Sequence, residues 1–297
     1  MSVIEIESLS RSYGRRRGIE SISFSVPQGT VFGFLGPNGA GKTTAIRVLV
    51  GLLRPSAGSA RIRGLDCWRD SRAIKAEVGY MPGDVRLQPW LDGAQALAIW
   101  GQIRRRPLTA YGRELAEMFD LDLSVKVRNM SRGMRQKLGL ILALAHRPQL
   151  LILDEPTVTL DPLMQAAVQR LLRAMAQQGH TILFSSHTLG EVDQLCDHVV
   201  MIRRGRIVAN ESLLTLRRHA GHRVTIRWAD AAAAAVAPPP FLTLDSQGGT
   251  VWTGMLSGPV EPLVRWLAER SIEDLAIGPP DLETLFRKFY DSTKESP

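Results

Sequence analysis

A glycine-rich segment at 36–44 constrains the fold of this chain more than any other feature. It fits the pattern G-x-x-x-x-G-K-[ST] and lies between an apolar run, 30–35, and a stretch with helical periodicity, 42–53. Its members are Gly36, Pro37, Asn38, Gly39, Ala40, Gly41, Lys42, Thr43 and Thr44. Glycines let the main chain turn so that several N–H groups point at one anion, and the following helix adds its positive end. Lys42 supplies a full charge for the β- and γ-phosphates of a nucleotide, and Thr43 offers a hydroxyl to Mg²⁺. The segment therefore predicts a nucleotide-phosphate site on a strand–loop–helix unit.

A second signal is an apolar strand that ends in two carboxylates. Residues 150–153 are all Leu or Ile, and Asp154 and Glu155 follow them. Short, fully apolar runs are typical of strands inside a parallel sheet. A carboxylate at the end of such a strand, beside a phosphate loop, can hold Mg²⁺ through its water shell, and this role suits Asp154. Glu155 can accept a proton from an attacking water. The alternative is an acidic pair that only starts a helix before Pro156, and the phosphate loop upstream makes it the weaker interpretation.

A third segment, 129–137, precedes a stretch with apolar residues at helical spacing, 138–145. Ser131 fits the N-cap position of that helix, and capping alone explains its presence. A helix N-terminus with exposed N–H groups is also an anion site. By itself, this segment does not separate the two interpretations.

Together and in this order, the three segments resemble the ABC transporter ATPase family over about residues 3–215. In that family the phosphate loop is the Walker A motif, 150–155 is Walker B, and 131–137 is similar to the signature usually written L-S-G-G-Q-R-Q-R. Tyr13 lies where the family has an aromatic residue that stacks on adenine. Asp161 belongs to a segment similar to the D-loop, and His187 ends a strand where the family has its γ-phosphate-sensing histidine.

The resemblance implies both a fold and a mechanism. The implied fold is α/β: a P-loop ATPase core with a RecA-like sheet, an antiparallel β subdomain and a helical signature subdomain. Two such domains would pair head to tail as a homodimer or a heterodimer, with ATP and Mg²⁺ at their interface. Ser131 and Gly133 of one subunit would contact the nucleotide held by Walker A of the other, and Asp161 would lie nearby. Glu155, His187 and Lys42 would carry the hydrolysis of ATP that drives transport.

The chain departs from the family pattern in three places. The signature has Arg132 and Met134 in place of glycine and glutamine, and 158–159 is Val-Thr in place of Ser-Gly. Gly83 stands where the family normally has a glutamine that reaches Mg²⁺ and the water. Asp84 or an extra water is a candidate substitute for that side chain. We expect hydrolysis to be retained, because the other hydrolytic residues are present.

One subgroup of the family shares three features with this chain: the Met-Arg-Gln form of the signature, the glycine at position 83, and a short C-terminal segment similar to 282–286. It comprises drug- and antibiotic-exporter ATPases that act with a separately encoded membrane permease of the ABC-2 type. The resemblance therefore implies export of a drug, antibiotic or other hydrophobic compound. Import stays open, as does a nucleotide-binding regulator without turnover, which the change at Gly83 would favour.

The pattern along the chain predicts two domains. An ABC ATPase domain is expected at 1–215, with a helical subdomain at about 88–146, and a small α+β accessory domain at 216–297. The expected elements of the second domain are strands at 224–228 and 250–255, helices at 262–269 and 281–290, and a low-complexity surface loop at 231–240.

The net charge of +8 comes largely from arginine clusters, such as those at 15–17 and 104–106. Basic clusters favour an alternative function, a soluble ABC ATPase that acts on nucleic acid or the ribosome. However, the chain has a single cassette, no coiled-coil insertion and no zinc-ligand cysteines, since Cys67 and Cys196 have the spacing of ordinary thiols. We therefore expect no nucleic acid partner.

Contact with a membrane is expected to be peripheral or through a partner. No apolar stretch approaches the ~20 residues that cross a bilayer, and the N-terminus does not have the pattern of a signal peptide. These features predict a peripheral location on the cytoplasmic face of the membrane. A groove around 83–100 is the expected docking site for a short permease helix, with Trp90, Leu91, Ile99 and Trp100 as its apolar surface. The alternative is that these side chains fill the core of the helical subdomain.

Overall fold

The computed structural model describes residues 1–14, 16–282 and 286 of the 297-residue chain. The chain divides into two compact units, Met1–Asn210 and Glu211–Pro297. The division comes earlier than the expected position after residue 215, because a short helix, α8 (Leu213–His219), groups with the second unit. The Oγ atom of Ser212 caps this helix by accepting a hydrogen bond from the N–H of Thr215 at 3.0 Å.

The centre of unit 1 is a six-stranded sheet with the order β10-β9-β3-β8-β7-β6. Its strands are β3 (Val31–Leu35), β6 (Val78–Met81), β7 (Leu150–Asp154), β8 (Thr181–Ser186), β9 (His198–Arg203) and β10 (Arg206–Ser212). Strands β6, β7, β8, β3 and β9 run parallel. Every residue of β3, β7 and β8 is buried, as expected for parallel strands that are covered on both faces.

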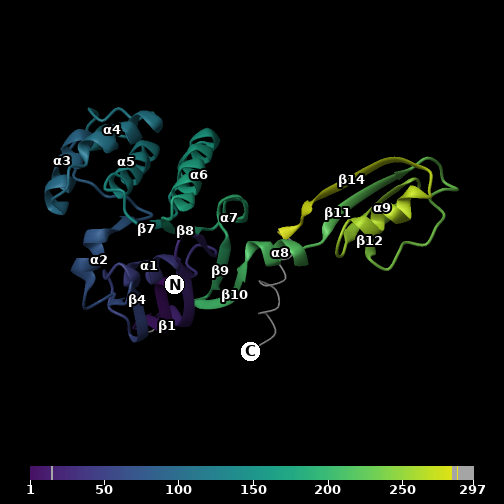
Figure 1. Ribbon diagram of the computed structural model, residues 1–297, viewed down its shortest axis with the longest axis horizontal. Coiled ribbons are helices and arrows are strands. Elements are labelled where there is room, and N and C mark those ends of the chain that lie inside the picture. Colours follow the sequence, from purple (N-terminus) through teal and green to yellow (C-terminus); the bar gives the residue numbers. More distant parts are fainter. Residues whose placement is uncertain (15, 283–285, 287–297) are drawn as a thin grey trace. The chain divides into compact units, whose positions relative to one another are not determined.

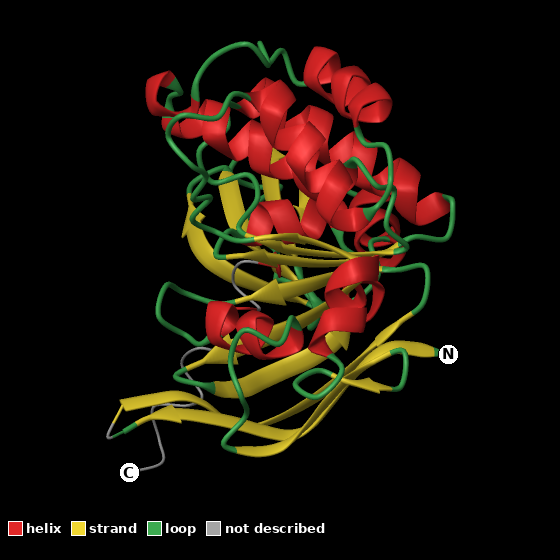
Figure 2. Cartoon of the chain, turned by 90° about the vertical axis from the view of Figure 1, so that its left-hand side faces the viewer, coloured by secondary structure: helices red, strands yellow, loops and turns green. Residues whose placement is uncertain are grey.

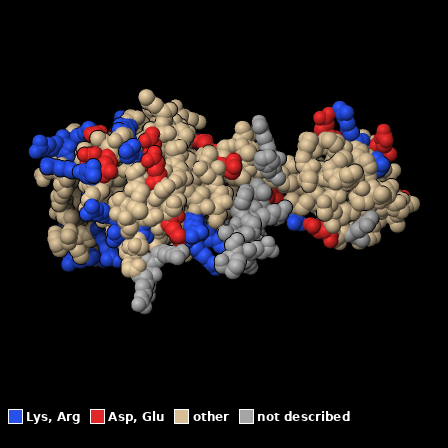
Figure 3. Space-filling view, turned by 90° about the horizontal axis from the view of Figure 1, so that it is seen from below, with Lys and Arg blue, Asp and Glu red and all other residues tan. Residues whose placement is uncertain are grey.

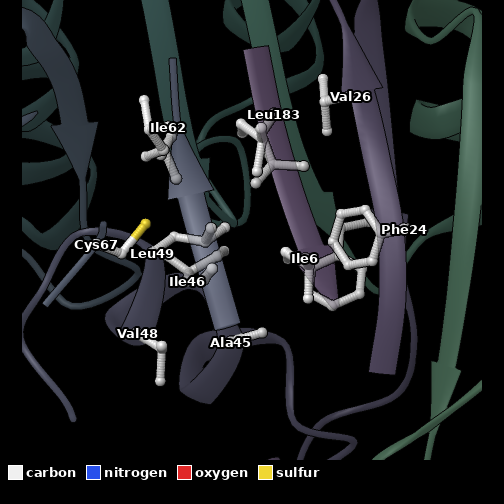
Figure 4. Packing of buried hydrophobic residues seen from close by; sticks show 14 of the residues in the cluster. Ile6, Phe24, Val26, Ala45, Ile46, Val48, Leu49, Ile62, Cys67 and Leu183 are labelled. Carbon is white, nitrogen blue, oxygen red and sulfur yellow. The ribbon is translucent and has the colours of Figure 1, made fainter. Parts of the chain in front are cut away.

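A second, antiparallel sheet completes the strands of unit 1. Its order is β2-β1-β4-β5, and it is formed by β1 (Ser2–Tyr13), β2 (Arg16–Pro27), β4 (Ala57–Ile62) and β5 (Leu65–Asp66). Along β1, buried residues alternate with exposed ones from Ile4 to Glu7. Helix α1 (Lys42–Leu49) contacts β2 and β4 of this sheet and also β7 of the central sheet. Figure 4 shows side chains of α1, such as Ile46 and Leu49, beside Ile62 of β4 in one continuous core.

Helix α1 ends earlier than the sequence pattern predicts. Apolar spacing favoured a helix through residue 53, but the chain leaves the helix after Leu49. Gly51 adopts a left-handed φ of 62°, and a Cβ atom there would lie 2.5 Å from the carbonyl oxygen of Cys67. Glycine therefore ends the helix here, and the apolar Leu53 packs against the core from the loop.

Five further helices of unit 1 form two groups. One group comprises α3 (Gly93–Arg104), α4 (Thr109–Met118) and α5 (Arg132–Leu144), which lie together in Figure 1 as the predicted helical subdomain. The other comprises α6 (Pro162–Gln177) and α7 (Leu189–Leu195), which pack on β3 and β8. Helix α2 (Ser71–Glu77) leads into β6. Figure 2 shows the helices of the chain in red and its strands in yellow.

Beyond α8, the described part of unit 2 is an antiparallel sheet with helix α9 (Glu261–Ala268) packed against it. The order is β12-β13-β11-β14, and its strands are β11 (His222–Trp228), β12 (Leu242–Gly248), β13 (Val251–Leu256) and β14 (Ile272–Pro280). Trp228 and Trp252 are fully buried in its core. Strands β12 and β14 were not predicted, and most of the helix expected at 281–290 lies outside the described residues. No helix among those that the structure describes is long and apolar enough to cross a bilayer.

Candidate active site

The glycine-rich loop occupies the position that the sequence predicts, after β3 and before α1. Gly41, directly before the first helical residue, has a φ of 115°. A Cβ atom on Gly41 would lie 2.7 Å from the carbonyl oxygen of Gly18, and one on Gly36 would collide with the carbonyl oxygen of Ile202. Only glycine fits these positions, because a side chain would push the loop away from the strands that support it.

The loop forms one wall of a cavity of about 760 Å³. The cavity is lined by Tyr13, Gly18, Pro37, Asn38, Gly39, Ala40, Gly41, Lys42, Thr43, Thr44 and Glu155. Its volume falls in the range of small-molecule and cofactor sites. The ring of Tyr13 is partly exposed, and its hydroxyl lies 3.5 Å from the Oγ1 atom of Thr44. An exposed aromatic ring beside a glycine-rich anion cradle can stack on a planar base.

Lys42 supplies the positive charge of the cavity. Its side chain is 4% exposed, and its Nζ atom donates hydrogen bonds to the carbonyl oxygens of Gly36 at 2.5 Å and Pro37 at 3.3 Å. The same atom lies 3.1 Å from the Oε1 atom of Glu155. The first helical residue of α1 thus holds its ammonium group over the loop rather than in solvent.

Glu155 connects Lys42 of the loop to His187. One carboxylate oxygen pairs with Lys42, and the other lies 3.3 Å from the Nδ1 atom of His187. The side chains of Glu155 and His187 are 21% and 38% exposed, so both are accessible to water. Three residues that lie far apart in the sequence therefore meet around one carboxylate, which is positioned to accept a proton from water near bound phosphates.

Asp154 is held deeper, at the end of β7. Its Oδ1 atom accepts a hydrogen bond of 2.7 Å from the hydroxyl of Ser185, which also accepts one of 3.0 Å from the N–H of Glu155. The Oδ2 atom of Asp154 is buried and has no hydrogen-bond partner among the described residues. Burial, and then the negative charge of Asp154, raise the pKa of Tyr80 to about 12. A buried carboxylate oxygen without a partner fits a cation or a cation-bound water.

Gly83 lies directly against this carboxylate. A Cβ atom on Gly83 would lie 3.3 Å from the main-chain oxygen of Asp154, which is a tight contact, and 3.5 Å from its Oδ2 atom. A side chain at this position would therefore require a small shift of its neighbour, and the chain places none there. Asp84, the candidate substitute, instead pairs with the exposed Arg86 at 2.7 Å.

Four predicted nucleotide contacts do not line this cavity: Gly36, Ser131, Gly133 and Asp161. Gly36 still belongs to the loop, where its carbonyl oxygen accepts a hydrogen bond from Lys42. Ser131 caps α5, since its Oγ atom accepts a hydrogen bond from the N–H of Met134 at 3.1 Å. Asp161 caps α6 through a bond of 3.0 Å from the N–H of Met164. Within one chain, Ser131 and Asp161 therefore have the roles of helix caps.

Sequence reasoning missed three residues that support the site. Ser185 joins both carboxylates, as described above. Gln136 of α5 donates from Nε2 to the carbonyl oxygen of Glu155 at 3.0 Å. Glu191 of α7 accepts two bonds of 2.5 Å, one from the hydroxyl of Thr157 and one from that of Ser186. Ser186 directly precedes His187, so proximity to a predicted site residue was the available signal for the serines.

Comparisons with known proteins agree with this geometry. Residues 19–158 match the family model described as ABC transporter. The daunorubicin resistance ATP-binding protein DrrA3 of Streptomyces coeruleorubidus is 36% identical, over 96% of this chain and 95% of that protein. The bacitracin transport ATP-binding protein BcrA of Bacillus licheniformis is 36% identical, over 70% of this chain and 69% of that protein.

Solved structures show the same fold. An ATP-binding subunit of an ABC transporter superposes with a TM-score of 0.68 at 30% identity, over 73% of this chain and 92% of that one. A dimeric ATP-binding cassette bound to ADP and Pi superposes with a TM-score of 0.63 at 19% identity, over 71% of this chain and 98% of that one. The predicted P-loop ATPase fold is thereby confirmed, and the comparisons do not favour the nucleic acid or ribosome alternative. The chain belongs to the ATP-binding, ATP-hydrolysing subunits of ABC transporters.

Proposed function

We propose that this chain powers export of a drug, antibiotic or other hydrophobic compound through a separate permease of the ABC-2 type. Relatives named for daunorubicin resistance, bacitracin transport and Nod factor export support this proposal, and the first of them is similar over 96% of the chain. The observation that carries the ATPase mechanism is the meeting of Lys42 and His187 at the carboxylate of Glu155. The proposed location is the cytoplasmic face of the membrane, held there by the permease.

In the proposed mechanism, the loop and Lys42 bind the phosphates, and Tyr13 stacks on the base. Glu155 accepts the proton of the attacking water, while His187 orients that carboxylate and contacts the γ-phosphate. The Nζ atom of Lys42 lies 3.1 Å from the carboxylate of Glu155. Bound phosphates and this carboxylate therefore have to share the ammonium group of Lys42. The chemistry is in-line attack by water, for which positioning and charge neutralisation supply most of the acceleration.

Thr43 and Asp154 are the proposed Mg²⁺ residues. The hydroxyl of Thr43 belongs to the cavity wall, and the Oδ2 atom of Asp154 has no partner among the described residues, so both have capacity for a cation or its water shell. When bound, Mg²⁺ would neutralise phosphate charge. Since Gly83 adds no side chain beside Asp154, we expect water to fill that part of the shell.

We further propose that two ATPase subunits pair, as a homodimer or with a homologue. Ser131, Gly133 and Asp161 would then contact the nucleotide held by the other subunit. All three lie at or beside the N-terminus of a helix, where main-chain N–H groups favour anions, and none lines the cavity of its own chain. This arrangement supports contact in trans.

The proposed permease surface lies on the helical subdomain. Trp90 is 65% exposed and Ile99 is exposed, whereas Leu91 is buried. The structure thus assigns Leu91 to the core, which corrects its predicted place on the docking surface. Trp90→Ala in the chain co-expressed with its permease should lower co-purification without lowering thermal stability. Leu91→Ala is the matched control, because it should destabilise the fold.

Basic side chains give little support to a nucleic acid surface. On the face in Figure 3, Lys and Arg side chains are interrupted by acidic and uncharged ones. Arg104 donates to the carbonyl oxygens of Lys75 and Ala76, and Arg106 pairs with Glu77 at 3.3 Å. The cluster at 104–106 is thus partly engaged within the protein.

The test of the proposed mechanism is Glu155→Gln in the purified chain. The variant should bind ATP but lose hydrolysis by about 100-fold or more, because no base remains for the water. It should also accumulate an ATP-dependent dimer in size-exclusion chromatography. Wild-type hydrolysis by this variant, or nucleotide binding that survives Lys42→Met unchanged, would contradict the assignment.

A further inference from the structure

Gln136 is a buried polar residue on α5 that does not line the nucleotide cavity. Its side chain is 4% exposed, and its Nε2 atom donates a hydrogen bond of 3.0 Å to the carbonyl oxygen of Glu155. Burying an amide is unfavourable unless it makes hydrogen bonds, so this contact needs an explanation beyond packing. The acceptor belongs to the residue that we propose as the base for hydrolysis.

The main chain of Glu155 has an uncommon conformation. Its φ is 49°, in the left-handed region that residues other than glycine seldom adopt. Such conformations persist only where the surroundings hold them, and they cluster at functional sites. At Glu155 the N–H donates to the hydroxyl of Ser185 at 3.0 Å, and the carbonyl accepts from Gln136. The two neighbouring peptide groups are therefore each fixed by one side chain.

Helix α5, which carries Gln136, is itself closely packed. A Cβ atom on Gly139, one turn further along the helix, would lie 2.6 Å from the Cγ2 atom of Val85. A Cβ atom on Gly133, near the start of the helix, would lie 3.2 Å from the carbonyl oxygen of Thr159. Because other segments approach the helix this closely at both points, the amide of Gln136 is presented to Glu155 from a rigid element.

We propose that Gln136 is a positioning residue for hydrolysis. Its amide holds the main chain of Glu155 in the left-handed conformation, and this conformation places the carboxylate between Lys42 and His187. The inference rests on the proposed role of Glu155 and deepens it. Gln136 acts through the main chain of Glu155, so it should affect the chemical step and leave ATP binding by the loop unchanged.

The test compares four forms of the full chain: wild type, Gln136→Met, Glu155→Gln and the double variant. Methionine keeps the length of the side chain and removes the donor. We expect kcat for ATP hydrolysis to fall about 10- to 100-fold in Gln136→Met, with KM for ATP within about threefold of wild type. In the Glu155→Gln background, Gln136→Met should cause no further loss, because the residue acts through Glu155.

Gln165→Met is the matched control. The Nε2 atom of Gln165 also donates to main-chain carbonyls after β7, those of Thr157 and Leu160, each at 3.2 Å, but it does not contact Glu155. We expect its kcat to stay within about threefold of wild type. If Gln136→Met does not fold, Gln136→Leu, which also removes the donor and adds no charge, takes its place.

The outcomes separate the inference from the proposed function. A Gln136→Met enzyme with wild-type kcat, alongside an inactive Glu155→Gln, overturns the inference alone. An equal loss in both backgrounds, or a rise in KM that accounts for the whole effect, also overturns it. Wild-type hydrolysis by Glu155→Gln removes the proposed role of Glu155 itself, and the inference with it.

Discussion

Replacing Ser185 by alanine removes one hydroxyl that makes two hydrogen bonds in the buried part of the site. The hydroxyl donates to the Oδ1 atom of Asp154 at 2.7 Å and accepts from the N–H of Glu155 at 3.0 Å. A bond to a charged group contributes about 1.5–3 kcal/mol and a neutral bond about 0.5–1.5 kcal/mol, so the free energy of unfolding should fall by about 2–4 kcal/mol. Ser185 is fully buried, which limits replacement of the hydroxyl by bulk water.

Urea denaturation of the full chain measures this loss, and steady-state ATP hydrolysis measures its functional effect. We expect kcat to fall about tenfold or more, because both carboxylates after β7 lose a support. Thr181→Val is the matched control at the other end of β8. The Oγ1 atom of Thr181 accepts one bond of 3.0 Å from the N–H of Gly29, so the loss should be near 1 kcal/mol with unchanged hydrolysis. A Ser185→Ala chain within about 0.5 kcal/mol of wild type would refute the reasoning.

Three other perturbations have defined outcomes. Glu191→Gln weakens two charge-assisted bonds beside His187, so kcat should fall while the affinity for ATP in a nucleotide-binding titration stays within about twofold. Burial, followed by the nearby positive charges of two arginines, lowers the pKa of His146 from 6.5 to about 4. As the pH falls, the unfolded chain takes up a proton at His146 before the folded chain does. The free energy of unfolding should therefore be highest above pH 6.5 and fall by up to about 3 kcal/mol towards pH 4. His146→Leu should remove this pH dependence from a plot of the free energy of unfolding against pH. Gly83→Gln places an amide beside Asp154, where a Cβ atom needs a shift of only a few tenths of an ångström, so hydrolysis should rise and half-saturation by Mg²⁺ should shift to lower concentration; an unchanged Mg²⁺ titration would contradict this.

Local patterns predicted the part of the site that one strand and one loop build. The glycine-rich segment and the apolar run before Asp154 each carry their signal within about ten residues, so both their elements and their chemistry could be read directly. Their meeting in space follows from the parallel order of the strands. The family resemblance supplied His187, whose own sequence context is weak.

The supporting residues could not be predicted, because their contacts join distant segments. Ser185 reaches Glu155 across two neighbouring strands, and Gln136 reaches it from a helix in another layer. A buried glutamine in an amphipathic helix has the same local pattern as an exposed one. Strand β14 was missed for a similar reason: its acidic residues do not follow the expected alternation, and pairing with β11 defines the strand.

The tryptophans divide between the units in a way that gives each unit its own optical signal. In unit 2 the rings of Trp228, Trp252 and Trp266 form a cluster, with centroids 4.9 to 6.4 Å apart. In unit 1, Trp68 and Trp90 are exposed and Trp100 is half-buried. Buried indoles in ring contact, such as Trp228 and Trp252, emit at shorter wavelength and give strong near-ultraviolet circular dichroism, and exposed indoles contribute little to either signal. Melting of unit 2 should therefore dominate the change of these two signals, without a label.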